Sequence, residues 1–210
     1  MAEAAPIIDR MRDSITRDTR LALDLVLTVR HDGDGGVADD LTDPAALTDW
    51  VHAHHDTLPG AERHLADAAC LTAVRDLRTA LRALFAHAVR PAPPSPADAT
   101  RPLSVPEALR RLNEAAARTP TVPVLTWDED DDPVVRRRPV PDGEYDLAAV
   151  LAQAAIGFLA GPDRERLRAC HAPRCVRYFL KEHPRQEWCK PSCGNRARVA
   201  RHHERQRRSG

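Results

Sequence analysis

The chain has 210 residues, of which 42% are hydrophobic and only 4% are aromatic. This length allows one domain of ordinary size and a small additional module, with a core built mainly from Ala, Leu and Val, which favours helix. No apolar run reaches the roughly 18 residues of a membrane span, and the first ten residues lack the pattern of a signal peptide. We therefore expect a cytoplasmic protein with no membrane partner.

The formal net charge is zero, but the charges are unevenly distributed. From Cys170 to Gly210, eleven Lys and Arg residues stand against three Glu and no Asp, so the rest of the chain is acidic. This asymmetry predicts a basic arm for an anionic partner, although a solvated tail would have the same composition.

Apolar residues recur at helical spacing in five segments before residue 162. The predicted helices lie near residues 20–29, 44–51, 62–90, 105–116 and 145–160. Asp43 or Thr42 is a suitable N-cap for the helix at 44–51, and Ser104 for the helix at 105–116. The segment 20–29 also alternates, which would allow a strand, and we expect Asp24 to lie in its apolar neighbourhood.

Two β-like runs, 121–127 and 133–138, flank the acidic stretch 128–132. This pattern predicts an antiparallel hairpin with an acidic tip.

Four of the five cysteines, Cys170, Cys175, Cys189 and Cys193, form two close pairs near the C-terminus. In a reducing cytosol such clusters are metal ligands more often than disulfides, and four thiolates typically hold one structural Zn²⁺. His171 or His183 could replace one cysteine, but four sulfurs are the simplest ligand set. We expect a knuckle, a hairpin formed by 176–180 and the segment returning to Cys189, and a helix beginning at the last ligand. This order resembles a treble-clef zinc finger.

The helix predicted after Cys193 carries arginines at steps of three and four, which form one cationic stripe. Arginine binds phosphates through its planar fork and can read guanine in the major groove. Asn195 could contact adenine or instead hold the zinc loop. Tyr178, Phe179 and Trp188 are expected to form a small core inside the finger. The proposed DNA-contacting residues are Arg177, Asn195, Arg196, Arg198, Arg201, Arg205 and Arg208.

The run Cys193-Gly-Asn-Arg196, with Trp188-Cys189 and Arg177-Tyr-Phe179, resembles the CGNR zinc finger. Upstream, the run from Leu21 to Thr28 is similar to the start of the ABATE domain, which precedes this finger in its family. Leu27 stands where that family often has Asn, and three residues separate the last two cysteines where many members have four.

The resemblance implies a mainly α fold: an orthogonal helical domain with a small β-hairpin over residues 1–162, then a zinc finger with a basic helix over 163–210. It also implies a stress-related transcription regulator that binds double-stranded DNA, with a small-molecule effector sensed by the first domain.

The residues leave several alternatives open. The finger could instead bind RNA or another protein, and a homodimer would compensate for the modest specificity of one finger. We find no catalytic set and expect no enzyme. Asp24 and Trp50 are the weakest candidates, for ligand binding. When bound to DNA, the protein would be associated with the nucleoid.

Overall fold

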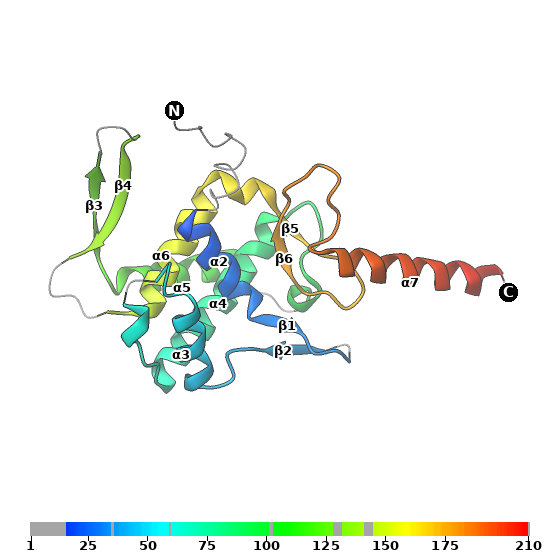
Figure 1. Ribbon diagram of the computed structural model, residues 1–210, viewed down its shortest axis with the longest axis horizontal. Coiled ribbons are helices and arrows are strands. Elements are labelled where there is room, and N and C mark those ends of the chain that lie inside the picture. The colour runs from blue at the N-terminus through cyan, green and yellow to red at the C-terminus, as the bar shows by residue number, and fades with distance from the viewer. Residues whose placement is uncertain are drawn as a thin grey trace, which may run out of the picture.

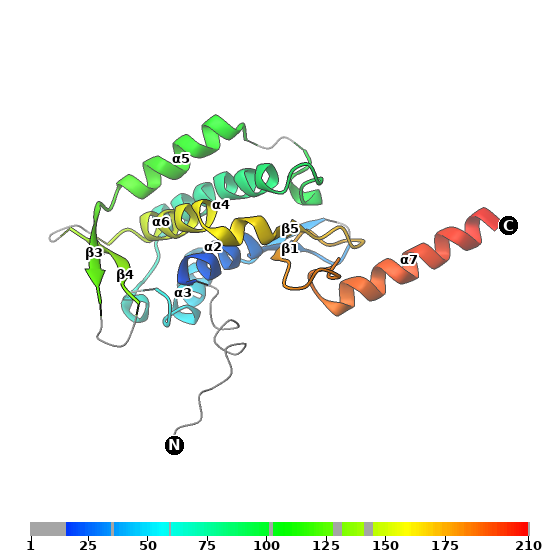
Figure 2. The ribbon, with the colours of Figure 1, turned by 90° about the horizontal axis from the view of Figure 1, so that it is seen from above.

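The computed structural model describes residues 16–34, 36–58, 60–100, 103–127, 132–140 and 145–209. Its body is helical, and a further helix, α7 (Pro191–Ser209), projects from one end (Figures 1 and 2). The body helices are α2 (Arg17–Leu27), α3 (Pro44–Ala53), α4 (Ala68–Ala88), α5 (Val105–Ala117) and α6 (Leu147–Ala160). The predicted mainly α fold is confirmed. No helix within the described ranges is both long and apolar enough to cross a membrane.

Each body helix begins after a side-chain cap. A Ser, Thr or Asp oxygen accepts the backbone N–H three residues ahead, which satisfies a donor that the first turn leaves free. The predicted caps Asp43 and Ser104 are confirmed. The helix expected from residue 62 begins only at Ala68, because Asp67 caps it and a 3₁₀ turn, η1 (Ala61–Arg63), precedes it.

The segment 20–29 is helical up to Leu27 and then continues into strand β1 (Val29–His31). Its buried side chains include Leu21, Leu25 and Val26. Asp24 is not enclosed among them, since 38% of its side chain is exposed. Asp24 therefore lies beside the apolar residues of α2, as expected, but at the margin of their buried face.

Among the described residues, three antiparallel strand pairs accompany the helices. β1 pairs with β2 (Val37–Asp39), and β3 (Thr121–Thr126) pairs with β4 (Val134–Pro139). The second pair confirms the predicted hairpin, whose acidic tip at 128–131 lies outside the described residues. It extends from the body at the end away from α7 (Figure 1).

The third pair differs from the prediction. Strand β6 (Tyr178–Leu180) pairs with β5 (Leu167–Ala169), which precedes the first cysteine, and not with the segment returning to Cys189. The register places Leu167 opposite Leu180 and Ala169 opposite Tyr178. The first cysteine pair therefore lies in the loop of this hairpin.

Strand β6 belongs to two cores because its side chains alternate between two faces. Tyr178 and Leu180 join the main core of the helical body, whereas Phe179 joins a small cluster around the cysteines. In the main core, Phe85 lies between Phe158 and Tyr178, with ring centroids 5.2 and 5.4 Å away. The finger is thus packed into the body along one strand.

Arg82 of α4 connects the body to this strand from inside. Its guanidinium forms two hydrogen bonds of 2.8 Å with Asp98, and only 6% and 11% of the two side chains are exposed. It also donates to the carbonyl of Val26 at 2.9 Å. Tyr178 donates its hydroxyl proton to the same Asp98 at 2.8 Å, and burial raises the pKa of Tyr178, so it remains a donor.

Replacing Arg82 by Met should be strongly destabilising. The change leaves the buried carboxylate of Asp98 without its ion partner, which typically costs about 3–5 kcal/mol. Urea unfolding followed by far-UV circular dichroism measures the effect. Arg110→Met is the control, since Arg110 is 54% exposed and pairs on the surface, where an ion pair contributes little to stability. Equal losses in the two variants would contradict this account of Arg82.

Candidate functional site: a zinc centre and an arginine-rich helix

The first cysteine pair is held by a tight turn between β5 and β6. The N–H of Cys175 donates to the carbonyl of Ala172 at 2.9 Å, and the N–H of Cys170 donates to the backbone carbonyl of Arg177 at the same distance. Arg174 takes a left-handed conformation with φ of 63°, which is uncommon for a residue with a Cβ. These contacts turn both thiols of the knuckle to the same side.

The second pair is positioned by the start of α7. The helix begins at Pro191, two residues before the predicted start, and Cys193 lies in its first turn. The N–H of Cys193 donates to the carbonyl of Lys190 at 3.0 Å. At Gly194 an added Cβ would lie 3.0 Å from the indole of Trp188. The glycine therefore allows Trp188 to pack directly on the helix.

The four sulfurs have the geometry of a tetrahedral metal site. All four Sγ atoms of Cys170, Cys175, Cys189 and Cys193 lie within 4.8 Å of one another. Cys189 Sγ is 3.7 Å from Cys175 Sγ and 3.5 Å from Cys193 Sγ. Tetrahedral zinc with Zn–S bonds of about 2.3 Å places its sulfurs roughly 3.8 Å apart. The residues fit one structural zinc ion.

The histidines considered as substitutes lie elsewhere. His171 and His183 are exposed, and neither belongs to the group of possible metal ligands found among the described residues. The ligand set is therefore the four cysteines.

Packing alone does not convert all four thiols to thiolates. The neighbouring thiols of Cys175 and Cys189 lower the pKa of Cys170, whereas the contact with Cys170 raises the pKa of Cys175 and that of Cys189. One negative charge thus opposes the next. A divalent cation removes this opposition, so zinc would be bound with release of protons.

Arg196, predicted to contact DNA, lies against the metal site. Its Nη2 is 3.1 Å from Cys193 Sγ, and its Nε donates to the carbonyl of Pro173 at 3.2 Å. The side chain thereby connects the helix of the second cysteine pair to the knuckle of the first. Such hydrogen bonds orient metal ligands and stabilise the charge on sulfur.

The small core of the finger contains two of the three expected aromatic residues. Phe179 is buried beside Cys170, Cys175 and Cys193, and Trp188 packs against this cluster. Tyr178 was wrongly assigned to it, because the alternation of β6 turns Tyr178 into the helical body.

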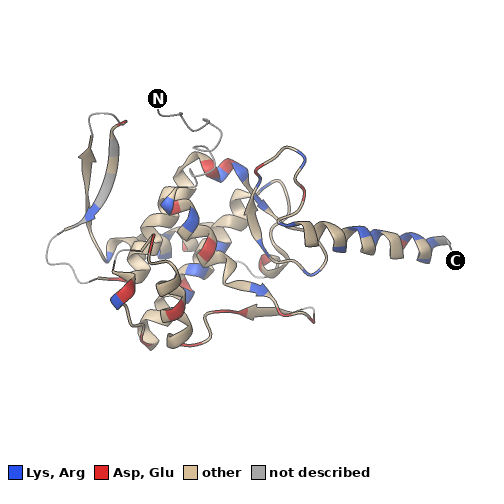
Figure 3. Cartoon of the chain, in the orientation of Figure 1, with Lys and Arg blue, Asp and Glu red and all other residues tan. Residues whose placement is uncertain are grey.

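Helix α7 presents the predicted arginines on a projecting surface (Figure 3). Arg198, Arg201, Arg205 and Arg208 are all exposed. Arg208 pairs with Glu204 at 2.7 Å, with 78% and 62% of the two side chains exposed, and a pair this exposed contributes little. Asn195 is also exposed and accepts a hydrogen bond from Arg198, so its partner is on the helix and not in the zinc loop.

Asp24 and Trp50 meet through a third residue, His54. The Nε2 of His54 is 3.2 Å from the Asp24 carboxylate, and its ring centroid is 4.1 Å from that of Trp50. The hydrogen bond to Asp24 raises the pKa of His54. His54 was not selected as a candidate from the sequence. Only the fold brings it into contact with both Asp24 and Trp50.

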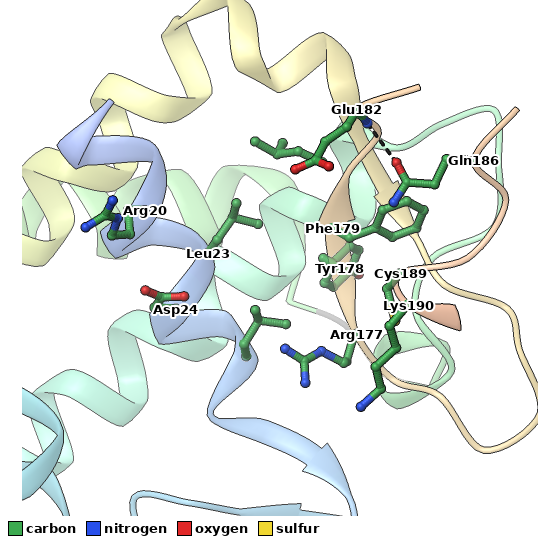
Figure 4. Close-up of a pocket in the computed structure, with 12 residues that line it drawn as sticks. Arg20, Leu23, Asp24, Arg177, Tyr178, Phe179, Glu182, Gln186, Cys189 and Lys190 are labelled. Carbon is green, nitrogen blue, oxygen red and sulfur yellow. Dashed lines mark hydrogen bonds between the residues drawn. The ribbon is translucent and has the colours of Figure 1, made fainter. Parts of the chain in front are cut away.

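A cavity of about 390 Å³ separates α2 from the finger (Figure 4). Its walls include Asp24 and Leu27 of α2 and Arg177, Cys189 and Lys190 of the finger. Trp50 is not part of the lining. Arg177, predicted to contact DNA, extends here toward α2.

Two family models together cover most of the chain. Residues 19–162 match ABATE, described as "Putative stress-induced transcription regulator". The chain belongs to the ABATE family. Residues 166–206 match the CGNR zinc finger, which contains all four cysteines. No curated protein sequence matches the chain.

Replacing Cys189 by Ser should remove zinc without unfolding the ABATE body. Loss of a ligand should weaken zinc binding by more than the roughly 10–100-fold that substitutions around a metal site cause. The body retains its helices, because Tyr178 and Leu180 pack in the main core independently of the metal. Zinc content after dialysis against a chelator and circular dichroism at 222 nm are the measurements.

Cys70→Ser provides the matched control, since Cys70 lies on α4 outside the cluster and should leave one zinc per chain. Retention of tightly bound zinc by the Cys189 variant would contradict the four-cysteine site. Loss of the helical signal would contradict the independence of the body.

Proposed function

We propose that this protein is a zinc-dependent DNA-binding transcription regulator. The observation that carries the proposal is helix α7, which projects from the body with exposed arginines along it and is anchored by a zinc ligand at its base. The family description supports a regulatory role. Zinc is required in this proposal because Cys193 fixes the first turn of the helix.

The dimensions and charge of α7 suit duplex DNA. Its 19 residues correspond to about 28 Å, and the major groove admits an α-helix. Six arginines and one glutamate lie between Pro191 and Ser209. Arginine side chains on successive turns can reach phosphates on both sides of a groove, and some can contact base edges.

Replacing both Arg201 and Arg205 by Gln should weaken binding to duplex DNA and reduce its salt dependence. Each lost phosphate contact lowers the slope of log K against log salt by about 0.9, so we expect a slope smaller by about 1.8. Fluorescence anisotropy over a range of salt concentrations measures it, using genomic fragments selected by the wild-type protein.

The control is the double change of Arg110 and Arg111 to Gln on α5, which removes the same charge from another helix of the body. An equal decrease of the slope in both double variants would show that net charge, and not the position of the arginines on α7, causes the effect. Absence of salt-dependent binding to duplex DNA by the wild-type chain would refute the proposal, and preference for structured RNA in competition would favour the RNA-binding alternative.

We further propose that the cavity between α2 and the finger, which we call the effector cavity, binds a small molecule that regulates the protein. Leu23, Leu27 and Phe179 give it apolar walls. Its basic side chains, Arg20, Arg177 and Lys190, outnumber the acidic ones, Asp24 and Glu182. This combination suits an organic acid with an apolar body. Because Cys189 also lines the cavity, a bound ligand would contact the segment that supplies a zinc ligand.

Leu27→Trp should fill the effector cavity and abolish stabilisation by its ligand. Leu27 is half-buried in the wall, so a larger side chain there occupies the space available to the ligand. A thermal-shift screen of organic acids identifies the probe, and the melting temperature with and without it is then compared between variants. Leu65→Trp, at a side chain that is 80% exposed, is the control. A ligand that still stabilises the Leu27 variant would place the effector site elsewhere.

Three expectations complete the proposal. A zinc ion held by four sulfurs has no open position for a substrate, which supports a non-catalytic role. We propose that the protein acts in the cytoplasm, at the nucleoid when bound to DNA. A homodimer stays a prediction.

A further inference from the structure

A second cavity lies where the loop of the β1–β2 hairpin meets the zinc knuckle, and we call it the seam pocket. Its volume is about 370 Å³. Strand β1 and the loop contribute Arg30, His31, Asp32 and Gly33. Most of the polar side chains in its wall are cationic: Arg30, Arg174, Arg177, Lys190 and Arg196. The pocket therefore combines the ABATE domain and the finger in one electropositive site.

His31 brings a donor that has no acceptor. Its Nδ1 accepts the backbone N–H of Gly33 at 2.8 Å, so the neutral ring carries its proton on Nε2. That Nε2 is buried and, among the described residues, has no hydrogen-bond partner. Only 15% of the His31 side chain is exposed. A buried donor without an acceptor is unfavourable. Because His31 lines the pocket, an anion that approaches the ring from the pocket would supply one.

Two of the cations line both this pocket and the effector cavity. Within the described parts of the chain, the side chains of Arg177 and Lys190 form no hydrogen bond or ion pair, whereas Arg30 pairs with Asp40. The nearest negative groups are already engaged. Asp32 accepts the N–H groups of its own turn at 2.8 and 2.9 Å. The zinc thiolates, whose net charge with the metal is about −2, are contacted by Arg196.

The two halves of the seam pocket are held in place. Arg174, in its left-handed conformation, donates to the carbonyl of Gly33 at 3.3 Å across the seam. The hairpin is fixed from behind by Arg78, whose two hydrogen bonds to Asp39 are both 2.6 Å long. Hydrogen bonds from Arg78 keep the pKa of Asp39 low despite its burial. These contacts fix the two walls of the pocket relative to each other.

We propose that the seam pocket binds a phosphate group. A phosphate has a negative charge and several acceptor oxygens, which suit the arginine and lysine donors of the pocket. One of these oxygens could also accept the hydrogen bond of His31, which has no acceptor among the described residues. The phosphate belongs either to a nucleic-acid backbone or to a free phosphorylated molecule. In the first case the ABATE domain itself contacts the nucleic acid, beside α7. Binding of free phosphate does not depend on α7 binding DNA, so the two proposals can fail separately.

The test observes His31 directly. The full-length, zinc-loaded chain is labelled with ¹⁵N-histidine and titrated with sodium phosphate against sodium chloride at constant ionic strength. The ¹⁵N shifts of the ring first establish whether the proton is on Nε2. We expect the Nε2 signal of His31 to change saturably with phosphate, because a new acceptor forms beside it.

Three variants distinguish binding from a structural role of His31. Lys190→Gln, at an exposed position, and His31→Leu should each weaken phosphate binding by about tenfold, as loss of one hydrogen bond to a charged group does. Binding to the His31 variant is measured by calorimetry. Arg185→Gln is the matched control, since Arg185 is an exposed finger arginine outside the pocket and should bind phosphate as the wild type does.

The source of the phosphate follows from two further titrations. If duplex DNA perturbs His31 and competes with phosphate, the site binds the backbone. If glycerol phosphate binds but DNA leaves His31 unchanged, the site binds a free phosphorylated molecule. The proposal is overturned if none of the three ligands changes the His31 signal, or if the Lys190 variant binds phosphate as tightly as the Arg185 control.

Discussion

The pairing of Arg82 with Asp98 in the interior is the interaction on which the arrangement of this protein depends. A buried ion pair is costly to form, because both charges lose their hydration. Here the cost is offset by the extra contacts that the two groups make with Val26 and Tyr178. Those contacts come from α2 and β6, so one charged pair determines how the first helix and the finger strand sit on α4.

Strand β6 packs the finger against the body. Tyr178 and Leu180 belong to the main core, Phe179 belongs to the zinc cluster, and the three residues are consecutive. A short strand with opposite faces in two cores cannot shift without disturbing both. This rigidity is what brings the effector cavity and the seam pocket against residues adjacent to the zinc ligands. A change in one domain would reach the other through the direct contacts of β6 with both cores.

Much of the fold was predictable because it depends on local patterns. Helical periodicity, the caps Asp43 and Ser104, and the spacing of the four cysteines all act over a few residues. What escaped prediction depends on contacts between distant segments. Strand β5 has three residues and no pattern of its own, so its pairing with β6 could not be read from the sequence. Arg82 has the spacing of an ordinary helix residue, and the partner that buries it lies 16 residues away.

The alternation of β6 also bears on where this protein can be divided. The two family matches meet between residues 162 and 166, yet that boundary is not a boundary of packing. Cutting there would leave Leu167, Tyr178 and Leu180 as an uncovered apolar strip on the finger, and would open a gap beside Phe85 in the body. Such strips promote aggregation. We therefore expect the isolated finger to be a poor self-contained domain, because one face of strand β6 packs in the core of the body.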